Sequence, residues 1–210
     1  MKLIYTDRSV CIMAINLPKE ERQSQIMEAA MKVITRKGFS NTRMDDIVHE
    51  SGMSKGAIYH HYEGKKEIFL ALIGHWETQT FPDFYSRNGK ERSAADTLKD
   101  FASEVIKVFK SRSHVFQAEV EFWALANQDD EVRKRSQELY EKIITLFELV
   151  IIKGIRENEF IKVDTRITAI YILSVFQGIN WFCIFKDKKI NAEDYIQKSI
   201  KLILSGLKIS

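Results

Sequence analysis

The stretch Gly52–Glu67 reads GMSKGAIYHHYEGKKE, and its turn residues divide it into short helical pieces. Gly52 is suited to end a preceding helix, and Ser54 can cap a second one that runs to about Tyr62. Gly64 then interrupts the chain again. Two short helices joined by a tight turn that contains glycine form a helix-turn-helix unit, so this stretch predicts one.

A longer helix and a capping box are predicted before the turn at Gly52. Pro18 opens a helix whose apolar residues recur every three or four positions, and Gly38 ends it. Thr42, with Asp45 three residues later, predicts a capping box. The short helix that follows it, residues 43–51, is the first of the two helices of the unit.

The pattern after the unit stays helical to the end of the chain. A long helix is expected from Lys65 to about Thr80, ended by Pro82. The 210 residues contain only two prolines and nine glycines, and no strand-like alternation occurs, so long helices are expected throughout. Five or so further helices are predicted, with starts near Ser93, His114, Asp129, Asp164 and Asn191. The predicted fold class is therefore all-α.

The positive charge is concentrated near the N-terminus. Residues 1–66 hold 11 Lys and Arg against 8 Asp and Glu, whereas the rest of the chain holds 21 of each. The whole formal excess of +3 therefore lies in the first third. Such a distribution is typical of a module that faces nucleic acid on a neutral body.

Composition argues against several other classes of protein. Cys11 and Cys183 lie far apart, which fits a reducing cytoplasm and no disulfide framework. We expect no membrane partner, because no apolar run looks long enough to span a bilayer. His60 and His61 are neighbours on a helix and point about 100° apart, so we expect no metal there. No catalytic, metal or phosphate-loop motif is found, so neither an enzyme nor a cofactor is expected.

The second helix of the unit carries side chains suited to DNA. Lys55 can meet a phosphate or a guanine edge, and the small Gly56 and Ala57 let the helix come close to the bases. Tyr59 and His60 offer donors to phosphate oxygens. Four further donors stand at helix starts, where backbone N–H groups already attract anions: Thr42, Arg43, Ser54 and Lys65.

The run Gly52–Glu67 closely resembles the signature of the TetR family of transcriptional regulators, in which a sequence like GVSKGTLYHYFKSKEEL occupies this place. The resemblance covers residues 20–75, and beyond them only length and helical pattern agree. Val48 and Ser51 depart from the usual alanines, and Ala57 replaces a frequent threonine, so one base contact could be to a thymine methyl. By resemblance, the positions used on DNA are Thr42, Arg43, Lys55, Gly56, Ala57, Tyr59, His60 and Lys65.

The resemblance implies an organisation and a mechanism. After a tail of residues 1–18, a three-helix helix-turn-helix DNA-binding domain would span residues 19–65, and an effector-binding and dimerisation domain residues 66–210. The protein would be a cytoplasmic homodimer that represses genes by binding double-stranded operator DNA, joined through the helices Thr165–Phe185 and Asn191–Leu207. An unidentified small-molecule effector would alter the spacing of the recognition helices, with the helix Lys65–Thr80 as transmitter.

The effector site is expected where aromatic and isolated polar side chains mix. A carboxylate among aromatics could hold a cation, whereas Arg87 or Arg112 could instead meet an acidic head group. Aromatics at helical spacing are also ordinary core residues, and Glu119 or Glu121 could be a solvated or interface charge. The candidates are Trp76, Phe84, Phe116, Glu119, Phe122, Trp123, Gln177, Asn180 and Trp181.

Other functions stay open from the sequence. An activator, or a regulator without a small-molecule effector, would have the same fold. An enzyme on a helical scaffold would need a clustered acid–base pair or metal ligands, and a purely dimerising helical module would not need the charge asymmetry.

Overall fold

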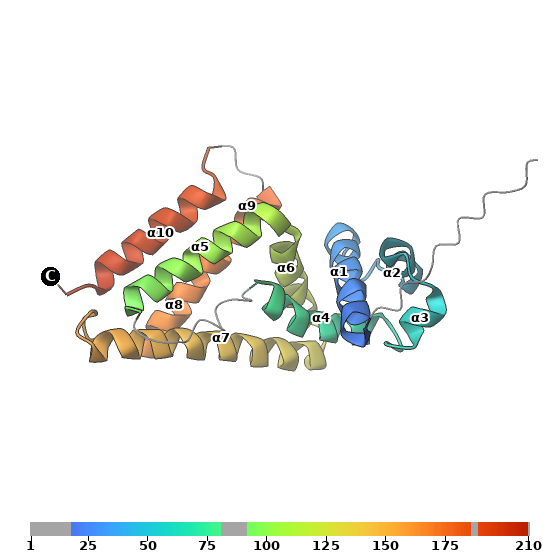
Figure 1. Ribbon diagram of the computed structural model, residues 1–210, viewed down its shortest axis with the longest axis horizontal. Helices are drawn as coiled ribbons and strands as arrows, with labels where there is room; N and C mark the ends of the chain where they lie inside the picture. The colour runs from blue at the N-terminus through green and yellow to red at the C-terminus, as the bar shows by residue number, and fades with distance from the viewer. Residues whose placement is uncertain (1–17, 81–91, 186–188, 210) are drawn as a thin grey trace, which may run out of the picture.

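The computed structural model describes residues 18–80, 92–185 and 189–209, and within these ranges the chain forms ten helices (Figure 1). No strand is present in the described ranges; Phe160 and Lys208 form one isolated bridge. The helices divide into a small lobe, residues 18–64, and a large lobe, residues 92–185 and 189–209. The all-α prediction is confirmed.

The small lobe is built from three helices: α1 (Lys19–Lys37), α2 (Met44–Ser51) and α3 (Lys55–Tyr59). The predicted apolar face of α1 is buried, and Gly38 ends the helix with a φ of 77°, a backbone conformation that favours glycine. Gly52 ends α2 in the left-handed region, with φ 68°. These two glycines set the turns that fold α1, α2 and α3 against one another.

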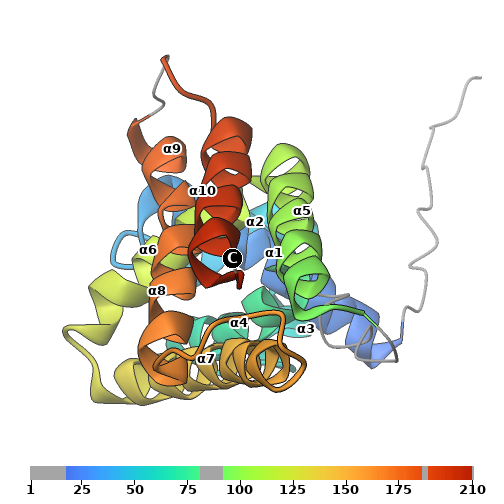
Figure 2. The ribbon, with the colours of Figure 1, turned by 90° about the vertical axis from the view of Figure 1, so that its left-hand side faces the viewer.

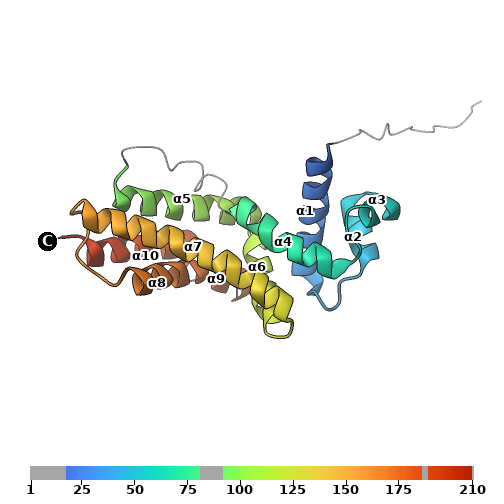
Figure 3. The same ribbon diagram turned by 90° about the horizontal axis from the view of Figure 1, so that it is seen from below.

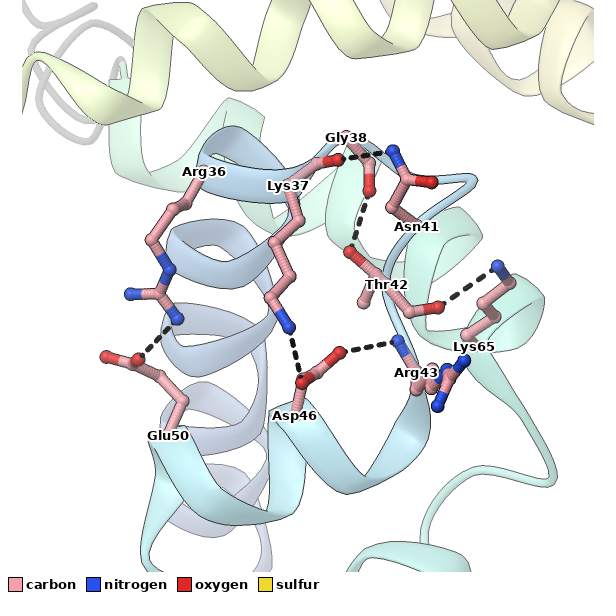
Figure 4. Close-up of polar contacts among 9 residues, drawn as sticks. All are labelled: Arg36, Lys37, Gly38, Asn41, Thr42, Arg43, Asp46, Glu50 and Lys65. Atoms are coloured by element: carbon pink, nitrogen blue, oxygen red, sulfur yellow. Dashed lines mark hydrogen bonds and ion pairs between the residues drawn. The ribbon is translucent and has the colours of Figure 1, made fainter.

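The start of α2 differs from the predicted capping box. The box was expected at Thr42 and Asp45, but it lies one residue later. The Asp46 carboxylate accepts a hydrogen bond from the backbone N–H of Arg43 at 2.9 Å (Figure 4). Thr42 is buried instead, and its hydroxyl donates to the Gly38 carbonyl at 2.8 Å. The N-cap position of α2 is therefore Arg43 rather than Thr42, whose hydroxyl is used within the protein.

The second helix of the unit is also shorter than predicted. α3 ends at Tyr59 rather than near Tyr62. The N–H groups of His61 and Tyr62 both donate to the Ile58 carbonyl, at 2.9 and 3.0 Å, which tightens the chain into a turn. This turn carries the Tyr62 ring into the core, where it is 8% exposed.

The large lobe holds six helices, one more than the five or so predicted. They are α5 (Ala94–Arg112), α6 (His114–Ala126), α7 (Asp130–Arg156), α8 (Thr165–Gln177), α9 (Ile179–Phe185) and α10 (Ala192–Leu207). Seen along the long axis, α5, α10 and the α8–α9 pair lie side by side, with α7 across one side (Figure 2). Predicted caps are confirmed in four helices, where a side-chain oxygen accepts a backbone N–H bond: Ser93, Asp129, Asp164 and Asn191.

The sixth helix arises because the expected helix Thr165–Phe185 breaks at Gly178. The Tyr195 hydroxyl of α10 donates to the Val175 carbonyl at 2.7 Å. A Cβ atom at residue 178 would lie 2.1 Å from that hydroxyl, which is too close without a shift. α8 ends at Gln177 and α9 begins at Ile179, on either side of this contact.

The same segment corrects the expectation about bilayer-spanning runs. Residues Thr165–Phe185 are 21 long with a mean hydropathy of 1.6, which is enough by length and composition to cross a membrane. In this structure 39% of that segment is buried inside the protein, and α8 packs against α7.

The two lobes are joined by α4 (Lys65–Thr80), which runs from one into the other (Figure 3). Its buried side chains Phe69, Leu72 and Trp76 belong to one core that continues from α1 to α10. The Trp76 indole N–H donates to the Val115 carbonyl of α6 at 2.7 Å. α4 thus packs on α1 at one end and on α6 and α7 at the other.

Candidate nucleic-acid interface and effector site

The exposed face of α3 lies at the end of the molecule opposite the large lobe (Figure 1). Ile58 is fully buried and anchors α3, and the Ser54 hydroxyl caps it by accepting from the Ala57 N–H at 3.2 Å. This anchoring turns four predicted contact residues outward, namely Lys55, Gly56, Tyr59 and His60. Arg43 and Ser54 are also exposed, so α3 and the start of α2 share one polar surface.

Lys55 is positioned on this surface by a carboxylate. Its ammonium lies 2.8 Å from the Asp45 carboxylate at the start of α2 and 5.9 Å from the centre of the Tyr59 ring. The Asp45 carboxylate raises the pKa of Lys55, so the ammonium stays charged. Both side chains are more than half exposed, which makes the pair easy for a phosphate to displace.

Lys65 has a different environment from the one expected. Its ammonium donates to three carbonyls of the loop between α1 and α2, those of Phe39 at 3.0 Å, Ser40 at 3.1 Å and Thr42 at 3.1 Å. The same nitrogen lies 4.6 Å from the centre of the Phe39 ring. All three ammonium donors are therefore engaged within the protein, as is the Thr42 hydroxyl (Figure 4). The predicted phosphate contacts of Lys65 and Thr42 stay predictions.

Ion pairs hold α2 against α1 beside this loop. Lys37 lies 2.6 Å from Asp46, and Arg36 lies 3.2 Å from Glu50 (Figure 4). The Lys37 ammonium and the Arg43 N–H lower the pKa of Asp46. The small lobe thus fixes the orientation of α2 and α3 through contacts that lie away from the α3 face.

The large lobe contains a buried polar cluster that we call the Glu119 cluster, formed by Glu119, Trp123, Tyr140, Gln177 and Asn180. One carboxylate oxygen of Glu119 accepts from the Tyr140 hydroxyl at 3.0 Å and from the Gln177 amide at 3.0 Å. The other accepts from the Asn180 amide at 2.9 Å. The Trp123 indole N–H donates to the Tyr140 oxygen at 2.6 Å. Four helices, α6 to α9, contribute to this cluster.

The interpretation of Glu119 as a solvated or interface charge is wrong, because its side chain is buried and the residue is 2% exposed. Burial raises the pKa of Glu119, against the lowering effect of its three hydrogen bonds. Burial and the neighbouring Glu119 likewise raise the pKa of Tyr140. The side-chain oxygen of Asn180 is also buried and accepts no hydrogen bond from the described residues.

The remaining candidate effector residues are spread out. Trp76, Phe116 and Phe122 belong to the apolar core. Trp181 is 55% exposed, and its ring centre lies 4.3 Å from that of Phe185, with the two rings tilted by 40°. Phe84 lies outside the described residues. The structure thus brings together four of the nine, Glu119, Trp123, Gln177 and Asn180.

Tyr140 is the member of the cluster that sequence reasoning missed. It lies four residues after the buried Ser136 and three before the buried Ile143, on the inward side of α7. That spacing is the signal that could have identified it.

Two carboxylates, Glu121 and Glu28, make polar contacts that connect the lobes. The Glu121 carboxylate of α6 accepts from the backbone N–H of Phe39 at 3.0 Å. Glu28 of α1 lies 3.5–3.7 Å from three basic side chains of α4, α5 and α6, which are His75, Arg112 and His114. The nearby imidazoles of His114 and His75 hold the pKa of Glu28 well below its usual range.

Among the described residues, no three His, Cys, Asp or Glu side chains are arranged to hold a metal ion.

A family model for bacterial regulatory proteins of the tetR family matches residues 26–72, which include α2, α3 and half of α4. Residues 26–72 are those of a TetR-family helix-turn-helix. The helix-turn-helix predicted from Gly52–Glu67 is therefore confirmed as this family's DNA-binding region.

Similar proteins extend the comparison to about nine-tenths of the chain. The chain is 26% identical over 188 residues to YfiR of Bacillus subtilis, described as an uncharacterized HTH-type transcriptional regulator; the match covers 89% of this chain and 91% of YfiR. Two solved structures share the fold. One, from Saccharomonospora viridis in complex with choline, has a TM-score of 0.79 and 18% identity, with 91% and 100% of the two chains covered. The other, FadR of Bacillus subtilis in complex with stearoyl-CoA, has a TM-score of 0.75 and 19% identity, with 87% and 97% covered.

Proposed function

We propose that this chain is a TetR-family repressor that binds double-stranded operator DNA as a homodimer and is released by a small-molecule effector. The observation that carries the proposal is the exposed α3 face, where Lys55, Tyr59 and His60 stand together on a helix anchored by Ile58. Residues 19–65 would form the DNA-binding domain and residues 66–210 the effector and dimerisation domain. Such a protein would act in the cytoplasm.

On DNA, the start of α3 would enter the major groove. The small residues Gly56 and Ala57 would let the backbone of α3 come close to the bases. The position of Gly56 is open, because a Cβ atom there would have no neighbour within 4 Å in the free protein. Lys55 would exchange the Asp45 carboxylate for a phosphate or a guanine edge. Tyr59, His60, Arg43 and Ser54 would contact the backbone on either side.

The dimer is supported by an apolar face that a single chain leaves uncovered. Exposed apolar residues recur at spacings of three and four residues within α8 and again within α9, which places them along one side of each helix. Leu202 of the neighbouring α10 is 70% exposed. A second copy of the chain would cover this face and set two α3 helices about 34–36 Å apart, one turn of DNA. The exposed residues of α8 and α9 are Ile167, Ile170, Tyr171, Trp181, Ile184 and Phe185.

Effector binding is supported by the Glu119 cluster and by the ligands, choline and stearoyl-CoA, in the two similar structures. α6 offers a route to the DNA-binding lobe. It carries Glu119 in the cluster and, two residues later, Glu121 on the Phe39 N–H. A ligand that binds best to a state with α6 and α4 displaced would change the spacing of the α3 helices and shift the population away from DNA.

Binding to labelled DNA from upstream of the protein's own gene tests the proposal, by fluorescence anisotropy at two salt concentrations. We expect saturable binding that exceeds scrambled DNA and weakens steeply with salt. The double variant Lys55→Ala, Tyr59→Ala should lose at least about tenfold in affinity. Lys162→Ala, an exposed lysine between α7 and α8, is the matched control and should bind normally. Wild-type affinity in the double variant would refute the assignment of the DNA surface.

The oligomeric state needs its own measurement. Analytical ultracentrifugation should give a dimer for the wild type and a monomer for Tyr171→Glu, because a carboxylate on the apolar face would be buried without a partner. A monomeric wild type would refute the homodimer. An activator of the same fold would bind the same DNA, and transcription assays with and without the protein distinguish it from a repressor.

A further inference from the structure

The Glu119 carboxylate lies inside the protein, and no positively charged side chain in the described part of the chain is paired with it. Its hydrogen bonds come from the Tyr140 hydroxyl and the Gln177 and Asn180 amides, which are all neutral groups. A carboxylate removed from water is costly unless a positive charge or a proton compensates it. The free protein therefore has an interior site with a deficit of positive charge.

The same site also lacks a hydrogen-bond donor. Asn180 uses its amide N–H on Glu119, and the oxygen of the same amide is buried with no donor from the described residues. Buried acceptors are nearly always satisfied in folded proteins, and unsatisfied ones call for a missing water or ligand. Because both needs occur at adjacent groups, one chemical group that is cationic and carries N–H would meet them together.

The cluster can be reached from the surface. Trp123 is 39% exposed, and Tyr140 and Gln177 are half-buried between solvent and the carboxylate. The two aromatic rings are linked by the indole–hydroxyl bond of 2.6 Å. A cation that enters along them would meet ring faces first, and then the carboxylate once Tyr140 or Gln177 turns aside.

We propose that the effector carries a protonated amine, whose ammonium N–H groups donate to the Glu119 carboxylate and to the side-chain oxygen of Asn180. The inference rests on the proposed effector binding and names its chemical class. A quaternary ammonium would supply the charge but no N–H, so Asn180 would stay unsatisfied. A carboxylate ligand would be repelled by Glu119, and an alcohol would supply a donor without the charge.

Calorimetry with four probes that share one tail tests the class directly: hexylammonium, hexyltrimethylammonium, 1-hexanol and hexanoate. We expect hexylammonium to bind at least about tenfold more tightly than each of the others. Glu119→Gln should abolish this preference, and it should fold normally because it removes a buried charge. Asn180→Leu should weaken hexylammonium and leave hexyltrimethylammonium unchanged. Glu138→Gln, an exposed carboxylate on α7, is the matched control.

The outcomes separate this inference from the proposed function. No hexylammonium binding, equal binding of hexanol or hexanoate, or full binding by Glu119→Gln would overturn the ammonium site. Hexylammonium binding that depends on Glu119 supports it, since calorimetry needs no DNA. The parallel anisotropy titration then tests release: a site that binds the amine without releasing DNA would leave the inference standing and refute only the release mechanism.

Discussion

Replacement of Lys65 by methionine tests whether this lysine stabilises the fold or contacts DNA. The change removes the ammonium that holds the carbonyls of Phe39, Ser40 and Thr42, while the methionine keeps most of the apolar stem. Hydrogen bonds to charged groups contribute about 1.5–3 kcal/mol each. The three bonds share one ammonium, and water can replace it at the exposed Ser40. We therefore expect a total loss of about 2–3 kcal/mol.

Two quantities are measured. One is the Tm from thermal unfolding, and the other is the salt slope, the change in the logarithm of the DNA-binding constant with the logarithm of salt concentration. For a chain of this length, about 1 kcal/mol corresponds to roughly 2–4 °C, so Lys65→Met should lower the Tm by about 4–12 °C. Its salt slope should equal that of the wild type, provided that DNA binding is measured below the lowered Tm. Lys55→Met is the matched comparison. Its exposed ion pair with Asp45 adds little to stability, but the loss of a phosphate contact should reduce the salt slope by about one.

One pattern would refute this reasoning. If Lys65→Met melts like the wild type and its salt slope falls by about one, then Lys65 leaves the three carbonyls when DNA binds and acts as a phosphate ligand. The role suggested by resemblance would then be correct.

Three further changes test packing and charge elsewhere. Gly154→Ala should destabilise the protein by about 1–3 kcal/mol in urea unfolding, because a Cβ there would overlap the Phe160 ring; an unchanged midpoint would show that the ring can move freely. Gly178→Ala should have a similar cost because of the Tyr195 hydroxyl, and adding Tyr195→Phe should recover part of it; strictly additive losses would contradict the proposed clash. Glu28→Gln should reduce stability at neutral pH. Because the pKa of Glu28 is lowered by folding, its carboxylate stabilises the protein above about pH 4.5, and this contribution is lost as the pH falls further. The Tm values of wild type and variant should therefore converge in acid. A difference in Tm that stays constant with pH would argue against the ion cluster.

Local signals in the sequence predicted most of the fold. Side-chain caps at Ser93, Asp129, Asp164 and Asn191 act within three residues of their partners, so sequence alone locates them. The break at Gly178 could not be predicted in this way. It depends on Tyr195, which lies seventeen residues away in sequence on another helix.

The same contrast holds for the candidate sites. The α3 face follows from helix spacing, because burial of Ile58 alone determines which side chains point outward. The roles of Lys65 and Thr42 depend on a loop folding back over α4, which no local pattern encodes. Glu119 was a candidate by its residue type, but whether a glutamate on an apolar helix is buried depends on the three helices packed around it.

The continuous packing of α4 limits how separable the two lobes are. Lys65, the first residue of α4, binds the loop of the small lobe, and the Phe69 ring packs against the Phe39 ring with their centres 4.7 Å apart. Trp76, eleven residues after Lys65, is bonded into α6. In a hybrid protein that joins the small lobe of this chain to the large lobe of another, any junction within α4 would therefore interrupt packing that both lobes share. The unit that could be exchanged intact is the small lobe together with α4 and the surface of α6 on which α4 packs. We therefore expect a sequence change on one side of this contact to require a matching change on the other side.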